Sequence, residues 1–135
     1  MKTLFLYVTS WLAGLSAYAG SCALFYHQTI ALTSVDFRAV AISSSLAFTV
    51  TFALFYLPLL LALRRLLRGV RPSWAFPAAA ALLGILPTAC ILFYWGGTPQ
   101  SLLSPEASPF FAMFTVAGLV AGIGFTRIYR RDQAA

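Results

Sequence analysis

Four long apolar runs, none containing Asp, Glu, Lys or Arg, dominate this 135-residue sequence. They cover about residues 3–26, 39–63, 74–95 and 109–126. About 20 apolar helical residues cross a hydrocarbon core about 30 Å thick, so each run is long enough or nearly long enough to span a membrane. Only 9% of the residues are charged, against about 25% in soluble domains, which leaves too few charges to cover a water-exposed surface. The sequence therefore predicts one all-α domain, 1–135, that forms a polytopic integral membrane protein with a four-helix transmembrane bundle.

Positive charge is distributed unevenly between the two sides of the predicted bundle. Of the nine basic residues, only Arg38 lies on one side, and all the others lie on the opposite side. Because cytoplasmic loops carry the excess of Lys and Arg, both termini are expected in the cytoplasm, as in a protein of the bacterial inner membrane. At the span ends these residues are placed to contact anionic headgroups, and their distribution does not favour nucleic-acid binding. Besides Lys2, they are Arg64, Arg65, Arg68, Arg71, Arg127, Arg130 and Arg131.

The N-terminal run also admits a second interpretation. Lys2, the apolar stretch and Ala17-Tyr18-Ala19 resemble a secretory signal with a small-residue cleavage site, and residues 19–22 resemble a degenerate lipoprotein processing site. Cleavage would leave three spans. The run continues to Tyr26, beyond a typical signal core, so an uncleaved span is favoured.

A short repeat raises the question of internal duplication. Cys22-Ala-Leu-Phe-Tyr26 and Cys90-Ile-Leu-Phe-Tyr94 each close an odd-numbered run. Two fused helical hairpins would give this pattern. A similar stretch, 53–56, lies in the second run, and the second and fourth runs align poorly, so biased composition is the favoured explanation.

The cysteines and the histidine lie in the predicted outer half of the membrane. Cys22 and Cys90 are the only cysteines. An oxidising outer face would allow one disulfide between the first and third spans, whereas two unpaired apolar thiols are the favoured alternative because both lie inside their runs. His27 is a candidate ligand for a haem iron or, with the two thiols, for a metal ion. Three ligands on separate helices form a weak pattern, so we expect no cofactor and no metal.

Hydroxyl side chains mark one face of the second run. Ser45, Thr49 and Tyr56 follow a helical spacing that places them on the same side. They form a candidate polar path for a solute. Such hydroxyls more often bond to a carbonyl one turn back or to a neighbouring helix, and packing is the favoured interpretation.

Small residues at four-residue spacing predict close helix packing. A helix of this chain or a helix of a partner is able to occupy these faces. Short connections also predict that consecutive spans pack as antiparallel neighbours, and Pro58 and Pro87 are expected to kink the second and third spans. The small residues singled out are Ala13, Ser16, Ala17, Gly20, Gly84, Gly118 and Gly122.

The lack of Asp, Glu, Lys and Arg in the predicted spans limits the range of functions. Such residues inside a membrane mark ion coupling and proton relays, and acid–base catalysis requires positioned titratable groups. We therefore expect a non-enzymatic accessory or scaffold subunit that packs against other membrane proteins or against a second copy of itself. A small-solute transporter or channel acting as a homo-oligomer is one alternative. A redox or cofactor-binding subunit that uses His27 is the other.

Overall fold

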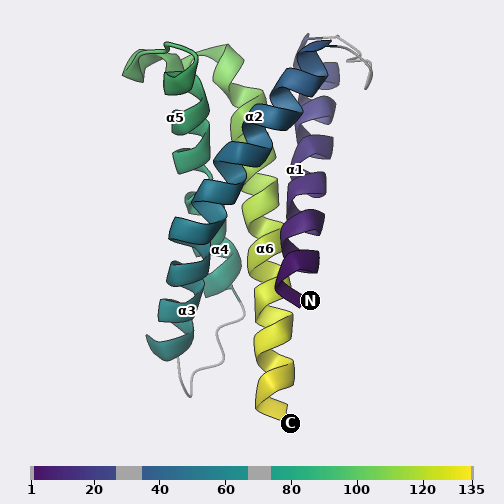
Figure 1. Cartoon of the computed structure of the whole chain (residues 1–135), viewed down its shortest axis with the longest axis vertical. Coiled ribbons are helices and arrows are strands. Elements are labelled where there is room, and N and C mark those ends of the chain that lie inside the picture. The colour runs from purple at the N-terminus through teal and green to yellow at the C-terminus, as the bar shows by residue number, and fades with distance from the viewer. Residues whose placement is uncertain (1, 27–34, 67–73, 135) are drawn as a thin grey trace.

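The computed structural model describes residues 2–26, 35–66 and 74–134, and every regular element in these ranges is helical (Figure 1). No strand is present in them. The elements are α1 Lys2–Tyr26, α2 Val35–Thr51, the π-helix η1 Phe52–Tyr56, α3 Leu57–Leu66, α4 Ala75–Leu82, α5 Ile85–Tyr94, the short 3-10 helices η2 Pro99–Leu103 and η3 Pro105–Ala107, and α6 Ser108–Ala134.

Four helical segments are long and apolar enough to cross a membrane: Thr3–Phe25, Val35–Ala62, Ala75–Tyr94 and Pro105–Ile128. They coincide with the four predicted runs, which confirms the all-helical class and the four candidate spans. Large apolar side chains such as Phe5 and Leu82 are more than two-thirds exposed on the outside of the helices. This outer surface is compatible with a multi-pass protein surrounded by lipid chains.

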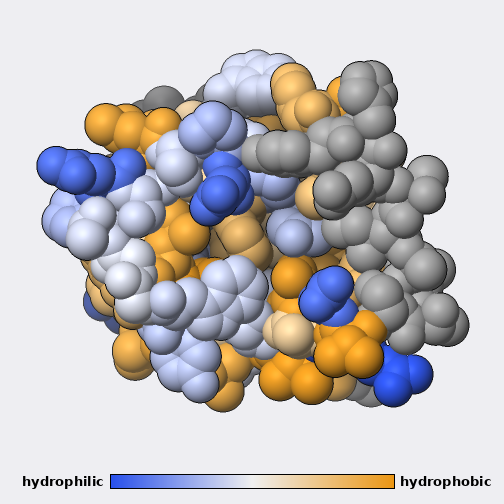
Figure 2. Space-filling model, turned by 90° about the horizontal axis from the view of Figure 1, so that it is seen from above, coloured by the Kyte–Doolittle hydropathy of each residue, from blue (hydrophilic) through white to orange (hydrophobic). Residues whose placement is uncertain are grey.

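Both ends of the chain lie at the same end of the bundle (Figure 1). The opposite end carries η2, η3 and the start of α2. Figure 2 looks onto this opposite end, where polar residues gather between apolar flanks. Two ends of a chain on the same side are expected when the chain has an even number of membrane spans.

Helix α6 is the central element of the bundle (Figure 1). It packs along α1 on one side and along α4 on another, and these are the two most extensive contacts between helices. Helix α1 contacts α2 less extensively, through Tyr7, whose hydroxyl bonds to Thr49 and whose ring packs against Phe48. Consecutive spans are therefore in contact as expected, but the main partner of α1 is α6. Small residues let α1 and α6 approach more closely than the larger side chains between α1 and α2 allow.

Glycines bring the backbone of α6 close to both partners. A β-carbon at Gly122 would lie 2.5 Å from the Cα of Pro77 in α4, and one at Gly118 would overlap the α4 backbone. On the other side, a β-carbon at Gly14 of α1 would lie 2.8 Å from the carbonyl oxygen of Met113. Non-bonded carbons ordinarily approach to about 3.5–4.0 Å, so these contacts exist only because the residues are glycines.

Aromatic rings fill the space between α2 and α6. The ring of Phe48 is fully buried, and its centroid lies 6.4 Å from that of Phe114 in α6 and 5.4 Å from that of Tyr7 in α1. Offset and edge-to-face aromatic pairs of this kind stabilise by about 0.5–1.5 kcal/mol beyond the burial of their area. Helix α2 is therefore held to the α1–α6 pair mainly by aromatic packing.

The second span is irregular immediately before Pro58. The amide of Leu57 donates to the carbonyl of Phe52, five residues back, as in a π-helix. One extra residue in this turn accommodates the proline ring, which would otherwise meet the carbonyl four residues before it. The π-helical turn is therefore the irregularity that the structure shows where a kink was expected at Pro58.

Candidate functional site

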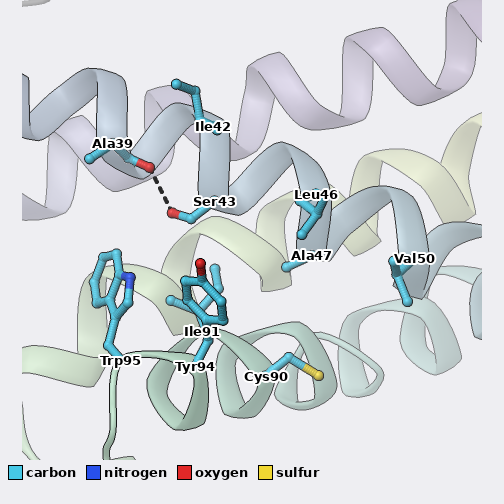
Figure 3. Close-up of a pocket in the computed structure, with 10 residues that line it drawn as sticks. All are labelled: Ala39, Ile42, Ser43, Leu46, Ala47, Val50, Cys90, Ile91, Tyr94 and Trp95. Carbon is cyan, nitrogen blue, oxygen red and sulfur yellow. Dashed lines mark hydrogen bonds between the residues drawn. The ribbon is translucent and has the colours of Figure 1, made fainter.

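An apolar groove with a volume of about 460 Å³ lies between α2 and α5 (Figure 3). Ala39, Ser43 and Ala47 recur at four-residue spacing, so one face of α2 presents small side chains to α5. The space that these small side chains leave is the floor of the groove. The larger Ile42, Leu46 and Val50 form its rim, and Cys90, Ile91, Tyr94 and Trp95 form the opposite wall.

The lining of the groove is mostly apolar, and its polar groups are the hydroxyls of Ser43 and Tyr94, the thiol of Cys90 and the indole N–H of Trp95. The Ser43 hydroxyl donates to the carbonyl of Ala39 at 2.7 Å, within its own helix (Figure 3). Trp95 is held in place because its ring stands edge-on to Phe110 of α6, with centroids 5.6 Å apart. The wall on the α5 side is therefore rigid near Trp95, and the interior suits an apolar molecule.

Charged residues of α2 stand near one end of the groove. Asp36 and Arg38, both exposed, lie within a turn of Ala39, the first groove residue of α2. Tyr94 and Trp95 lie at the same end, on α5 and just after it. The other end, at Val50, lies in the interior of the second span, between Thr49 and Thr51.

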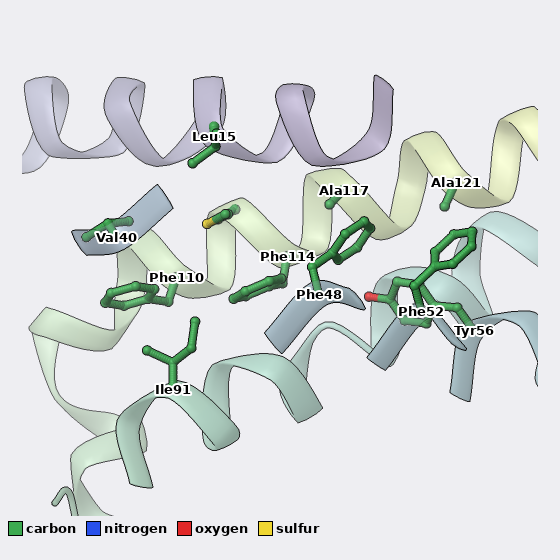
Figure 4. Close-up of a cluster of buried hydrophobic side chains, with 11 residues drawn as sticks. Leu15, Val40, Phe48, Phe52, Tyr56, Ile91, Phe110, Phe114, Ala117 and Ala121 are labelled. Atoms are coloured by element: carbon green, nitrogen blue, oxygen red, sulfur yellow. The ribbon is translucent and has the colours of Figure 1, made fainter. Parts of the chain in front are cut away.

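The predicted polar path does not form a common channel among the described residues. The Ser45 hydroxyl donates to the carbonyl of Ile42 at 3.2 Å, and the Thr49 hydroxyl lies 2.6 Å from the carbonyl of Ser45. Thr49 also bonds to the Tyr7 hydroxyl at 2.7 Å, which links α1 to α2. Tyr56 is fully buried among aromatic rings (Figure 4), and its hydroxyl has no hydrogen-bond partner in the described part of the chain. None of these three residues lines the groove.

The third span is interrupted at Leu83 and Gly84. Because Pro87 has no N–H to donate to Leu83, that carbonyl accepts instead from the amide of Leu86 at 3.1 Å. The buried Thr88 hydroxyl donates to the carbonyl of Gly84 at 2.9 Å. Side-chain and backbone donors thus satisfy both carbonyls at the break.

Three of the singled-out glycines lie in contacts within the chain. Gly118 and Gly122 face α4, as described above. A β-carbon at Gly84 would lie 2.9 Å from the carbonyl carbon of Phe114 in α6. These positions are therefore occupied by the chain's own helices.

Two of the small residues singled out on α1 lie away from its contact with α6: Ser16 is exposed, and Gly20 would place a β-carbon with no atom within 4 Å. Ala13 and Ala17 are half-buried. The face that meets α6 carries Gly14 instead, one turn after the buried Ser10. The Ser10–Gly14 spacing was a usable signal for this face that the sequence reasoning missed.

Cys22 and Cys90 are both free thiols in the structure. Cys22 is buried, whereas Cys90 is exposed in the groove. The disulfide that the sequence left open is therefore not formed. His27 lies outside the described residues, and within the described ranges no three His, Cys, Asp or Glu side chains gather as metal ligands do.

Apart from Arg38, near the start of α2, the basic residues in the described ranges belong to helices at the end of the bundle where α1 begins and α6 ends. Arg65 and Arg127 are exposed, and Arg64, Arg130 and Arg131 belong to α3 and α6. Arg68 and Arg71 lie outside the described residues. Helices α3 and α6 end on the same side of the bundle (Figure 1), so the exposed Arg65 and Arg127 lie toward that side.

This chain matches no known family model, no curated protein and no solved structure. The function of the chain must therefore be inferred from its own residues. Two surfaces of the described bundle have a distinctive shape: the outward face of α1 around Gly20, which carries small residues, and the groove between α2 and α5. Both suit contact with apolar groups, and neither presents a nucleophile with a neighbouring base.

Proposed function

We propose that this chain is a small non-enzymatic membrane protein that serves as an accessory or scaffold subunit. In this proposal its four spans cross the bacterial inner membrane with both termini in the cytoplasm. The exposed basic side chains at one end, such as Arg65 and Arg127, support that orientation because they favour the cytoplasmic side. They would contact the anionic headgroups there.

One observation carries the subunit role: α1 has a small-residue face that its own bundle leaves uncovered. Ser16 is exposed, and Gly20 has open space where a side chain would stand. Within the same molecule, glycines on α6 show how closely such a face lets two backbones approach. A helix of another membrane protein, or of a second copy, would pack on the face of α1 in the same way.

The interior of the bundle supports a role in helix packing rather than in catalysis or transport. The hydroxyls of Ser45, Thr49 and Thr88 are bonded to carbonyls of their own helices, so they are not held ready for a solute. The predicted spans hold no Asp, Glu, Lys or Arg that would couple transport to an ion.

The subunit role is tested by purifying the full-length tagged chain in a mild detergent and identifying bound proteins by mass spectrometry. A second, differently tagged copy in the same cells reveals self-association. Gly20→Leu is expected to lower recovery of the partner on the order of ten-fold, because overpacking a close helix contact costs about 1–3 kcal/mol. Ala78→Leu, at an exposed alanine of α4, is the matched control and should leave recovery unchanged. A monodisperse wild-type monomer with no bound protein would contradict the role.

The break in the third span favours a second candidate, a small-solute transporter. Discontinuous spans form the substrate sites of many transporters, and Leu83–Gly84 lies between two helices of one span. Liposomes containing the purified chain would then show solute flux that falls with Thr88→Val. Absence of flux for a broad panel of small solutes would exclude this candidate.

A further inference from the structure

The groove between α2 and α5 has the length of one membrane leaflet. On α2 it runs from Ala39 to Val50, a rise of about 16 Å at 1.5 Å per residue. Half of a hydrocarbon core about 30 Å thick is about 15 Å. A molecule that fills the groove from its charged end therefore extends from the headgroup region to the middle of the bilayer.

The volume of the groove, about 460 Å³, falls in the range of pockets that hold small molecules. A single hydrocarbon chain has a width of about 4–5 Å, since non-bonded carbons approach to about 3.5–4.0 Å.

The walls match such a chain in polarity. The only hydroxyl on the floor, that of Ser43, is already bonded to Ala39. Ile42 and Leu46 stand 72% and 68% exposed along the rim, so the protein leaves their apolar surface for another molecule to cover. A methylene chain would cover it without leaving a polar group unpaired.

The charges at the mouth indicate the headgroup. Asp36 is exposed there, and its spacing from Ala39 and Ser43 places it on the groove face of α2, whereas Arg38 lies on another side of the helix. Tyr94 and Trp95 stand at the same end, as aromatic side chains do at the level of lipid headgroups. A zwitterionic headgroup with an ammonium group complements the carboxylate of Asp36, whereas a purely anionic headgroup is repelled by it.

We propose that the groove between α2 and α5 binds one acyl chain of a zwitterionic phospholipid, of the phosphatidylethanolamine type, from the leaflet on the Asp36 side. The site is separate from the face of α1 that carries the proposed subunit role. It requires that the chain is inserted in a membrane, but it does not require a protein partner.

The proposal is tested by native mass spectrometry of the full-length chain released from vesicles that contain phosphatidylethanolamine and phosphatidylglycerol. One phosphatidylethanolamine molecule is expected to stay bound to the wild-type chain. Ala47→Phe fills the floor of the groove and is expected to reduce that adduct on the order of ten-fold. Ala78→Phe, at the exposed alanine of α4, adds the same ring elsewhere and should retain the lipid. Equal retention by the two variants would overturn the proposal.

Further variants test the floor of the groove if the first variant does not fold, and test the choice of headgroup. If Ala47→Phe does not fold, Ser43→Leu narrows the same floor with a smaller side chain and should lose the lipid as well. Asp36→Asn is expected to reduce the preference for phosphatidylethanolamine, because the ammonium group loses its anionic partner, whereas Arg38→Gln on another side of α2 should leave that preference unchanged. Retention of phosphatidylglycerol in preference to phosphatidylethanolamine, or release of a protein dimer that carries no lipid, would each refute the assignment.

Discussion

Replacing Gly122 with alanine tests whether α6 packs on α4 through direct backbone contact. The new β-carbon would stand 2.5 Å from the Cα of Pro77 and 2.7 Å from the carbonyl oxygen of Phe76. Carbon atoms need about 3.5–4.0 Å, so the shortfall is at least about 1 Å. Neither neighbour is the end of a flexible side chain, and the two helices must therefore move apart.

The expected change in the free energy of unfolding follows from two opposing effects. Overpacking costs about 1–3 kcal/mol, whereas replacing a helical glycine with alanine returns about 0.5–1 kcal/mol of backbone entropy. Because all the contacts at Gly122 are with backbone atoms, we expect a net loss of about 1–2 kcal/mol. Gly20→Ala is the matched control, since no atom lies within 4 Å of its β-carbon, and it should gain up to about 1 kcal/mol.

Unfolding of the purified chain by SDS in mixed micelles, followed by circular dichroism, measures both changes. The two substitutions are chemically identical and lie in long apolar helices, so helix propensity cancels between them. The contact between α4 and α6 would be refuted if both variants shifted stability in the same direction by the same amount.

The tyrosines and the cysteines allow three further predictions. Tyr56→Phe should leave stability unchanged or raise it by about 1 kcal/mol, because it removes a buried hydroxyl without a partner; a loss of stability in the SDS titration would contradict this. Tyr7→Phe should instead cost about 0.6 kcal/mol, because it breaks the 2.7 Å hydrogen bond to Thr49. The folded chain should take up one apolar maleimide, at the exposed Cys90, and a second only after denaturation exposes Cys22. Intact-mass spectrometry counts the labels, and double labelling of the folded chain would show that α1 does not bury Cys22.

The number and approximate extent of the candidate spans could be predicted because they depend on local hydropathy. A run without charges needs no knowledge of its neighbours to be identified as a helix that suits a membrane. Irregularity near Pro58 and Pro87 was predictable for the same reason, since a proline disturbs the residues just before it. The contact of Gly84, at the break, with Phe114 of α6 was not predictable, because it depends on a helix distant in the sequence.

The pairing of the helices and the groove could not be predicted from spacing alone. Gly14 and Gly20 are both small residues of α1, yet only Gly14 meets α6. The choice is set by the rotation of α1 about its axis, which depends on all of its contacts together. In the same way, Ala39, Ser43 and Ala47 indicate a smooth face on α2, but the sequence does not say that α5 stands opposite it.

The central place of α6 has a consequence for how the chain is made. Helix α1 ends at Tyr26 and α6 begins at Ser108, so about 80 residues must be added before α1 meets its main partner, about 4–16 s at bacterial or eukaryotic synthesis rates. In the membrane insertion proposed above, α1 has to remain an independent helix during that time, and its unbroken course from Lys2 to Tyr26 suits this requirement. A chain that stops before α6 would leave both α1 and α4 without their closest contact. Quality control of membrane proteins would then encounter a chain with two unpaired helices.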